Sequence, residues 1–206
     1  MNVLLINGSP KEHGCTYTAL SEVAASLHRH SISTEMLYLG IKPIAGCIAC
    51  MKCREKGYCV FDDAVNEVLA KLESYDAIVI GSPVYYAAPA GNLLSFLNRL
   101  FFCGGARMAG KLGASVVSCR RGGAASAFDQ LNKYFTICNM PIVASQYWNQ
   151  VHGSVPDDVR QDEEGLQTMR TLGENMAWLL ACIQAGRQQG VPKPVYEPHL
   201  WTNFIR

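Results

Sequence analysis

Short apolar runs alternate with segments of helical periodicity along most of the chain. The apolar runs cover residues 3–6, 34–39, 77–81, 114–118 and 141–145. The first, third and fourth are apolar at consecutive positions, which is typical of strands buried on both faces of a parallel sheet. Helical periodicity after each run predicts helices over residues 16–29, 63–74, 91–102, 124–138 and 162–188.

Five strand–helix units predict a flavodoxin-like three-layer α/β/α sandwich with a five-stranded parallel sheet. We expect a single domain over residues 1–206, with residues 190–206 as an extended C-terminal tail, because Pro192, Pro194 and Pro198 interrupt regular structure there. In this fold ligands bind beyond the carboxyl ends of the strands. The loops after the first, third and fourth strands should therefore converge.

Composition and charge exclude several classes of function. The chain has 206 residues, of which 49% are hydrophobic, and its 18 basic and 17 acidic side chains leave a net charge of +1. This mixture gives no electrostatic footprint for nucleic acid or an anionic membrane. The N-terminus lacks a signal-peptide pattern, and no run of about 18 apolar residues occurs, so we expect a cytoplasmic protein without a membrane segment.

The loop after the first predicted strand reads NGSPKEHGCTYT over residues 7–18. A strand–loop–helix junction presents unpaired backbone N–H groups and the positive end of a helix dipole, which together bind a phosphate. Neither a Walker A loop nor a G-x-G-x-x-G loop is present, which disfavours triphosphate hydrolysis and dinucleotide binding. Taken alone, the loop would equally suit simple helix capping. The candidate phosphate-binding residues are Ser9, Pro10, Lys11, Gly14, Cys15 and Thr16.

Two further loops should meet the first one at the same edge of the sheet. GSPVYYAAPAG supplies aromatic side chains suited to a flat heteroaromatic ring, with the candidates Pro83, Val84, Tyr85 and Tyr86. The glycines of SCRRGG let the backbone approach a ligand closely, and its arginines supply positive charge. The candidates in this loop are Ser118, Cys119, Arg120, Gly122 and Gly123. Separately, the tyrosines would suit a core and the arginines a solvated helix start. Together, the three loops predict FMN, a mononucleotide with a large planar ring.

Several segments resemble the NADPH-dependent FMN reductase and iron–sulfur flavoprotein family of the flavodoxin-like superfamily. GSPKEHGCT looks like the family's G-S-P-x-x-x-G-N-T phosphate loop, and GSPVYYAAPAGNLLSFLNRL looks like its ring-binding segment. IAGCIACMKCREKGYCVFDD and SCRRGGAASAFDQLNKYF are similar as well. One departure is Cys15, which stands where the family usually has Asn and so removes an amide donor near the phosphate.

Four of the nine cysteines form the motif C-x2-C-x2-C-x5-C, and they are Cys47, Cys50, Cys53 and Cys59. Such short intervals place thiolates close together, and soft sulfur ligands favour an iron–sulfur cluster or zinc over harder ions. The spacing is similar to the compact motif by which iron–sulfur flavoproteins hold a [4Fe–4S] cluster. A [4Fe–4S] cluster, a zinc ion and four reduced thiols without metal remain the three alternatives.

The resemblance implies an FMN-dependent oxidoreductase that passes electrons from NAD(P)H through FMN to a quinone, nitro, azo or flavin acceptor. No acid–base pair is evident in the sequence, and Arg120 is expected to stabilise negative charge on the flavin. The alternative from another class is an iron–sulfur flavoprotein that acts as an electron carrier and exchanges electrons with ferredoxin. The resemblance also implies a homodimer or homotetramer.

Overall fold

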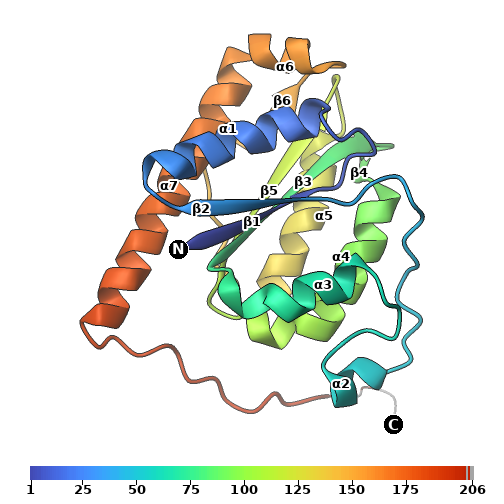
Figure 1. The fold of residues 1–206 in the computed structure, drawn as a ribbon, viewed down its shortest axis with the longest axis vertical. Helices are drawn as coiled ribbons and strands as arrows, with labels where there is room; N and C mark the ends of the chain where they lie inside the picture. The colour runs from blue at the N-terminus through green and yellow to red at the C-terminus, as the bar shows by residue number, and fades with distance from the viewer. Residues whose placement is uncertain (203, 205–206) are drawn as a thin grey trace.

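The computed structural model describes residues 1–202 and 204 and shows a central sheet covered by helices (Figure 1). The strands are β1 (Asn2–Asn7), β2 (Ser33–Tyr38), β3 (Ala77–Tyr85), β4 (Ala88–Pro89), β5 (Leu112–Cys119) and β6 (Gln150–His152). The helices are α1 (Cys15–Arg29), α2 (Lys52–Lys56), α3 (Ala64–Lys71), α4 (Gly91–Met108), α5 (Ala124–Ile137), α6 (Pro156–Gln161) and α7 (Glu163–Gln188). A short 3₁₀ helix, Leu72–Ser74, follows α3.

The main sheet has the strand order β2-β1-β3-β5-β6, and these strands are all parallel. This is the order of a flavodoxin-like fold, so the predicted fold class is confirmed. The sheet has six strands rather than the predicted five, because β4 pairs antiparallel with the end of β3. This hairpin lies at the carboxyl edge of the sheet, where ligands are expected.

The two faces of the sheet carry separate cores, as consecutive apolar positions predicted. On β1, Leu4 and Ile6 pack with α3, α4 and α5, whereas Val3 and Leu5 pack with α1 and α7. Helices α1 and α7 lie side by side on their face of the sheet (Figure 1). Gly173 of α7 permits this close approach, since a Cβ atom there would clash with the Cβ of Ser26 in α1.

The prediction of a strand over residues 141–145 is wrong. Only Ile142 bridges β5, at Gly113, and the fifth parallel strand is β6, further along the chain. Between them the Ser145 hydroxyl oxygen lies 2.6 Å from the Tyr147 carbonyl oxygen and 2.6 Å from the Asn149 side-chain oxygen. These local contacts form where the chain lies away from β5, and it returns at Asn149, whose carbonyl accepts a hydrogen bond from the Val117 N–H at 2.9 Å.

The predicted helices are present, with differences in extent and number. The helix predicted over residues 63–74 is divided into α3 and the following 3₁₀ helix, and the one predicted over residues 91–102 continues to Met108. The short helices α2 and α6 were not predicted from the sequence pattern. Asp162 separates α6 from α7 and caps α7 by accepting a hydrogen bond from the Gly165 N–H at 2.9 Å. Within the described residues, no helix is long and apolar enough to span a bilayer.

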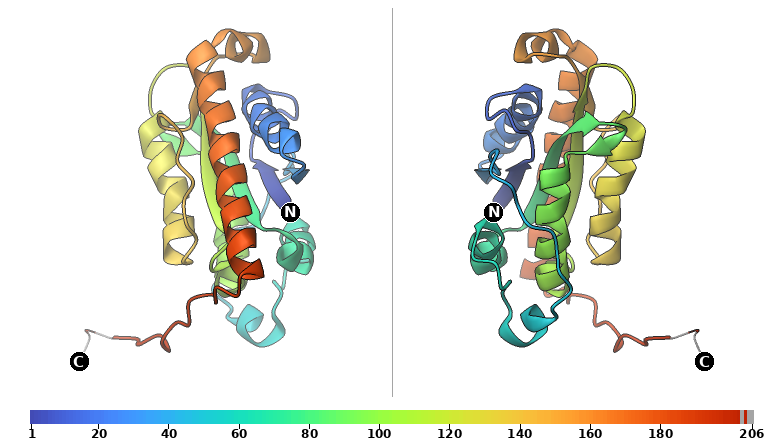
Figure 2. Two further views of the ribbon diagram at one scale, coloured as in Figure 1. Left: turned by 90° about the vertical axis from the view of Figure 1, so that its left-hand side faces the viewer. Right: turned by 90° about the vertical axis from the view of Figure 1, so that its right-hand side faces the viewer.

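In the described part of the predicted tail, which spans residues 190–206, the chain leads away from the end of α7 (Figure 2). Its residues 203 and 205–206 lie outside the described part of the chain. Residues 191–202 have neither helix nor strand and are exposed. Large apolar side chains are among them, with Val195 97% and Leu200 85% exposed.

Candidate functional site

The carboxyl ends of β1, β3 and β5 lie at one edge of the sheet, and the three predicted loops meet there (Figure 1). The hydroxyl of Thr16, at the start of α1, lies 2.9 Å from the hydroxyl of Ser118, at the end of β5. A Cβ atom on Gly123 would lie only 2.9 Å from the Cα of Ala87 in the β3–β4 hairpin. The structure therefore brings all three loops together, and we call this edge the rim.

The loop from β1 to α1 is shaped by Asn7, a buried residue that sequence reasoning missed. Its side-chain nitrogen donates to the Glu12 carbonyl at 2.9 Å, and its side-chain oxygen accepts from the Ser9 N–H at 3.1 Å. The buried Ser9 hydroxyl in turn accepts from the Lys11 N–H at 3.1 Å. These bonds fix the loop and leave Pro10 and Lys11 exposed at its tip.

The first turn of α1 carries neither a side-chain cap nor an acidic residue. Its N-cap, Gly14, has an extended backbone and gives no side-chain hydrogen bond. Among the described residues, the first N–H with an acceptor in this turn is that of Thr18, which donates to the Gly14 carbonyl at 3.0 Å. The preceding amides, beginning at Cys15, are therefore available to an anion, with buried Thr16 beside them.

The β3–β4 hairpin presents the second set of candidates. Pro83 and Val84 are half-buried in β3, whereas Tyr85 is exposed and Tyr86 is fully exposed. Tyr86 and Ala87 both have left-handed backbones, with φ of 50° and 60°, as the central residues of a type I′ turn do. Non-glycine residues in this conformation are strained, and such strain is concentrated at functional sites. The hairpin thus holds an aromatic side chain out at the rim.

The loop from β5 to α5 presents the third set. Ser118 and Cys119 are buried at the end of β5, and Arg120 and Gly122 are exposed. Gly123 is the N-cap of α5 and has a φ of 87°, which glycine adopts most readily. The turn therefore depends on glycine both for its backbone conformation and for its contact with the hairpin.

The charge at the rim suits an anion. Lys11 and Arg120 are exposed there and carry positive charge. Burial raises the pKa of the Cys15 thiol and that of the Cys119 thiol, so neither adds a negative charge at neutral pH. The uncapped start of α1, the hydroxyls of Ser9 and Thr16 and the exposed Lys11 form a donor set that fits a phosphate, and Arg120 adds positive charge on the β5–α5 loop.

The four clustered cysteines lie elsewhere, around one cavity between their own segment and α4. Cys47 and Cys50 are exposed, Cys53 and Cys59 are half-buried, and all four are free thiols. In the described part of the chain, no three potential metal ligands are already gathered as a metal site. The donor type and the shared cavity fit a soft metal or an iron–sulfur cluster.

Cys59 is the most tightly held of the four. Its backbone N–H donates to the Asn66 side-chain oxygen at 2.8 Å, and its carbonyl accepts from the Asn66 side-chain nitrogen at 3.0 Å. Its Sγ accepts a hydrogen bond from Nε of Arg99, in α4, at 3.2 Å. Burial alone would lower the pKa of Arg99, but hydrogen bonds to Asp63 and to Cys59 outweigh it, so the guanidinium is firmly charged.

A fifth cysteine, Cys103 of α4, lines the same cavity. Burial, reinforced by the neighbouring Cys53, raises the pKa of the Cys103 thiol to about 11, so it is protonated at neutral pH. Sequence spacing gives no reason to group Cys103 with the other four. The sequence could have pointed to Arg99, because an arginine on the apolar stripe of a helix needs a buried partner.

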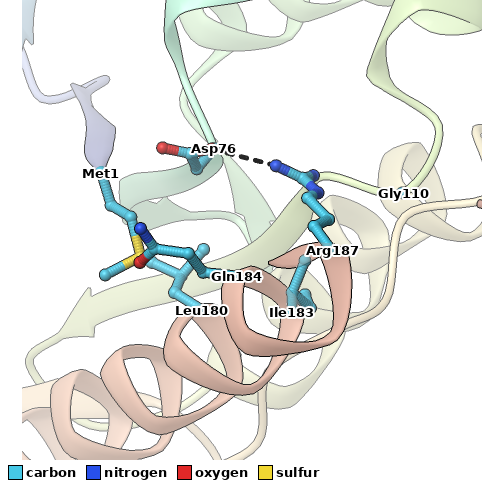
Figure 3. A pocket seen from close by; sticks show the side chains of 7 residues that line it. All are labelled: Met1, Asp76, Gly110, Leu180, Ile183, Gln184 and Arg187. Carbon is cyan, nitrogen blue, oxygen red and sulfur yellow. Dashed lines mark ion pairs between the residues drawn. The ribbon is translucent and has the colours of Figure 1, made fainter. Parts of the chain in front are cut away.

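A separate hollow lies at the opposite edge of the sheet (Figure 3). Met1 and Asp76, which precede β1 and β3, line it together with Arg187 of α7. The Asp76 carboxylate and the Arg187 guanidinium are 3.9 Å apart there. This hollow contains none of the predicted site residues, and it faces the amino ends of the strands.

Comparison with known protein families shows the family to which the chain belongs. A family model described as NADPH-dependent FMN reductase matches residues 1–154. The chain belongs to the NADPH-dependent FMN reductase family. This membership confirms the predicted family and the predicted enzyme class, an NAD(P)H-dependent FMN oxidoreductase.

One sequence relative agrees with this assignment, and two solved structures agree with the fold. An iron–sulfur flavoprotein of Methanocaldococcus jannaschii is 31% identical over 192 residues, which are 89% of this chain and 100% of that protein. The solved structure of an NAD(P)H:quinone oxidoreductase from Methanothermobacter marburgensis is 15% identical, with a TM-score of 0.66 over 85% of this chain and 98% of the other. A flavodoxin from the domain Archaea gives a TM-score of 0.60 at 14% identity, over 88% and 99%. These two structures confirm the flavodoxin-like fold.

We expect Gly123→Ala to lower the free energy of unfolding by about 1–3 kcal/mol, because it forces a side chain into a left-handed backbone. The added Cβ would also press on Ala87. Gly122→Ala is the matched control, since a Cβ atom added there would meet nothing within 4 Å. Urea unfolding of both variants without cofactor measures the difference, and equal midpoints would contradict the contact between the loop and the hairpin.

Proposed function

We propose that the rim binds FMN and that the protein passes electrons from NAD(P)H through this FMN to a small acceptor such as a quinone, nitro, azo or flavin compound. The observation that carries the proposal is the uncapped start of α1, which lies beside the meeting point of the hairpin and the β5–α5 loop. Family membership supports the cofactor and the reaction class.

The phosphate of FMN would lie against the β1–α1 loop. The donors are the free amides at the start of α1, with the hydroxyls of Ser9 and Thr16 beside them and Lys11 supplying positive charge. Pro10, Gly14 and Cys15 complete this loop. The Asn7 hydrogen bonds hold it in place before the cofactor arrives, so less ordering is needed on binding.

The ring system would lie between the hairpin and the β5–α5 loop. Residues of the hairpin would cover one part of the ring, and they are Pro83, Val84, Tyr85 and Tyr86. The other loop would contribute backbone groups and positive charge through Ser118, Cys119, Arg120, Gly122 and Gly123. Arg120 is placed to stabilise a negatively charged ring.

FMN supplies the electron-transfer chemistry itself when it is bound. The chain's residues bind the phosphate, orient the ring and leave its exposed side open to a donor and an acceptor. Tyr86 stands free at the rim, where it would stack on a flat acceptor. Because the tail of the chain is exposed and apolar, it would pack on a neighbouring copy in a homodimer or homotetramer.

The second candidate function adds an iron–sulfur cluster and makes the protein an electron carrier. It is favoured by the single cavity that all four clustered cysteines line. The matched relative from Methanocaldococcus jannaschii carries the name iron–sulfur flavoprotein. Cys47, Cys50, Cys53 and Cys59 would hold the cluster, which would add a one-electron centre. Ferredoxin would then be the partner in place of a small acceptor.

Thr16→Val should weaken FMN binding by roughly tenfold, because it removes a hydroxyl next to the proposed phosphate, a hydrogen bond worth about 1.5 kcal/mol. Thr16→Ser keeps the hydroxyl and should bind like the original protein. Thr18→Val is the matched control, because Thr18 is on the same helix turn but is not among the residues assigned to the phosphate, and its hydroxyl donates to the Gly14 carbonyl at 3.2 Å. Titration of flavin fluorescence measures the dissociation constants of the original protein and of the three variants. Unchanged affinity in Thr16→Val would contradict the assigned role.

Turnover separates the two candidate functions. We expect steady oxidation of NADPH or NADH when a quinone is added to the FMN-loaded protein, because the open rim admits small planar molecules. Flavin reduction by reduced ferredoxin, together with no steady oxidation of either nicotinamide cofactor, would instead identify an electron carrier. Stopped-flow absorbance follows the flavin in both experiments.

Metal content tests the cysteine site independently of turnover. After anaerobic reconstitution we expect about four iron and four sulfide per chain, and Cys53→Ser should lose most of both. Cys182→Ser is the matched control, because Cys182 is an exposed cysteine on α7 and does not line the cavity. One zinc per chain without sulfide would support the zinc alternative, and no metal in either protein would remove the site.

A further inference from the structure

Arg99 is a buried arginine whose hydrogen-bonding capacity is fully used. Its side chain is 1% exposed. Two donors reach the Asp63 carboxylate at 2.6 and 2.9 Å, two reach the carbonyls of Ala45 and Phe61 at 3.3 and 3.2 Å, and Nε donates to Cys59 Sγ at 3.2 Å. A guanidinium has five N–H donors, so none remains free.

These five bonds connect the two ends of the cysteine segment to one point on α4. Ala45 precedes the first clustered cysteine, and Phe61 follows the last one. Asp63 is the N-cap of α3, where its side chain also accepts a hydrogen bond from the Val65 N–H. The Phe61 ring lies against the guanidinium, with 4.8 Å between the guanidinium carbon and the ring centroid. The segment that carries the cysteines is thereby closed into a loop by one side chain.

The bond to sulfur distinguishes Arg99 from an ordinary buried ion pair. Asp63 balances the charge of the guanidinium, and the two carbonyls satisfy further donors. Nε nevertheless points at Cys59, the cysteine whose backbone is also fixed by Asn66. Hydrogen bonds to cluster sulfurs and the nearby charge are among the factors that set the reduction potential of an iron–sulfur centre.

We propose that Arg99 is a positioning residue of the cysteine site: it holds Cys59 in place as a ligand, and its hydrogen bond to the sulfur raises the reduction potential of the bound cluster. This inference rests on the cluster proposed above. The sign follows from charge, because reduction adds an electron and a hydrogen-bond donor stabilises the more negative state. Lysine could not replace Arg99 in this role, since it lacks the planar guanidinium that reaches the carboxylate, the carbonyls and the sulfur at once.

The test compares reduction potentials of reconstituted protein by anaerobic redox titration. The double variant Arg99→Met with Asp63→Asn removes one positive and one negative charge, so net charge is unchanged, and Asn remains a good N-cap. We expect its cluster to be at least about tenfold harder to reduce, which is about 59 mV more negative for a one-electron couple. Arg99→Lys keeps the charge and should shift in the same direction.

Arg107→Lys is the matched control, because Arg107 lies on the same helix and pairs with Glu73 at 2.9 Å but, within the described residues, donates to no sulfur. Its potential should equal that of the original protein. Iron content, FMN affinity and urea unfolding are measured for every variant. Loss of iron from the Arg99 variants, with FMN affinity and unfolding unchanged, would support the positioning role.

Two results would overturn the role of Arg99. One is a potential within error of the original protein in both Arg99 variants, with iron retained. The other is loss of iron together with a lower free energy of unfolding, which would show that Arg99 supports the whole fold rather than the cysteine site. If the original protein takes up no iron, the proposal of a cluster is itself wrong. This result is seen before the variants are compared.

Discussion

The parallel pairing of β1 between β2 and β3 is the constraint on which both candidate sites depend. Val3 pairs with Ala77 and with Thr34, so the three strands run in register; β1 and β2 end opposite each other, and β3 continues to Tyr85. The pairing continues past the end of β1, because the Gly8 N–H donates to the Gly81 carbonyl of β3 at 2.9 Å. All the loops that follow these strands therefore start at one edge, and the cysteine segment starts there too, after β2.

The parts of this arrangement that the sequence predicts are those with a local cause. Consecutive apolar residues predicted β1, β3 and β5 because both faces of these strands are buried. The start of α1 was predictable because glycine, serine and threonine directly after a strand are typical of a turn that leads into a helix. The contact between Thr16 and Ser118, 102 residues apart, required only that the strand order be right.

Other features could not be predicted, because their causes lie far apart in the chain or compete locally. Residues 141–145 have the apolar composition of a strand, but only Ile142 bridges β5, and the Ser145 side chain contacts its own loop. The left-handed turn at Tyr86 has no glycine to signal it. The partners of Arg99 are far from it in the sequence and meet it only in the folded chain, since Cys59 and Asp63 precede it by 40 and 36 positions.

Helix α4 joins the rim to the cysteine pocket. It begins beneath the hairpin, where the Ala90 N–H donates to the Ser82 hydroxyl at 3.0 Å, and it reaches Arg99 about 12 Å further along its axis at 1.5 Å per residue. A hydrogen-bonded helix is stiff in length and is anchored here at both places. In the proposed iron–sulfur flavoprotein, this helix would hold a fixed separation between its start at the rim and Arg99 beside Cys59, and so would limit how far the gap that an electron crosses within one chain could vary.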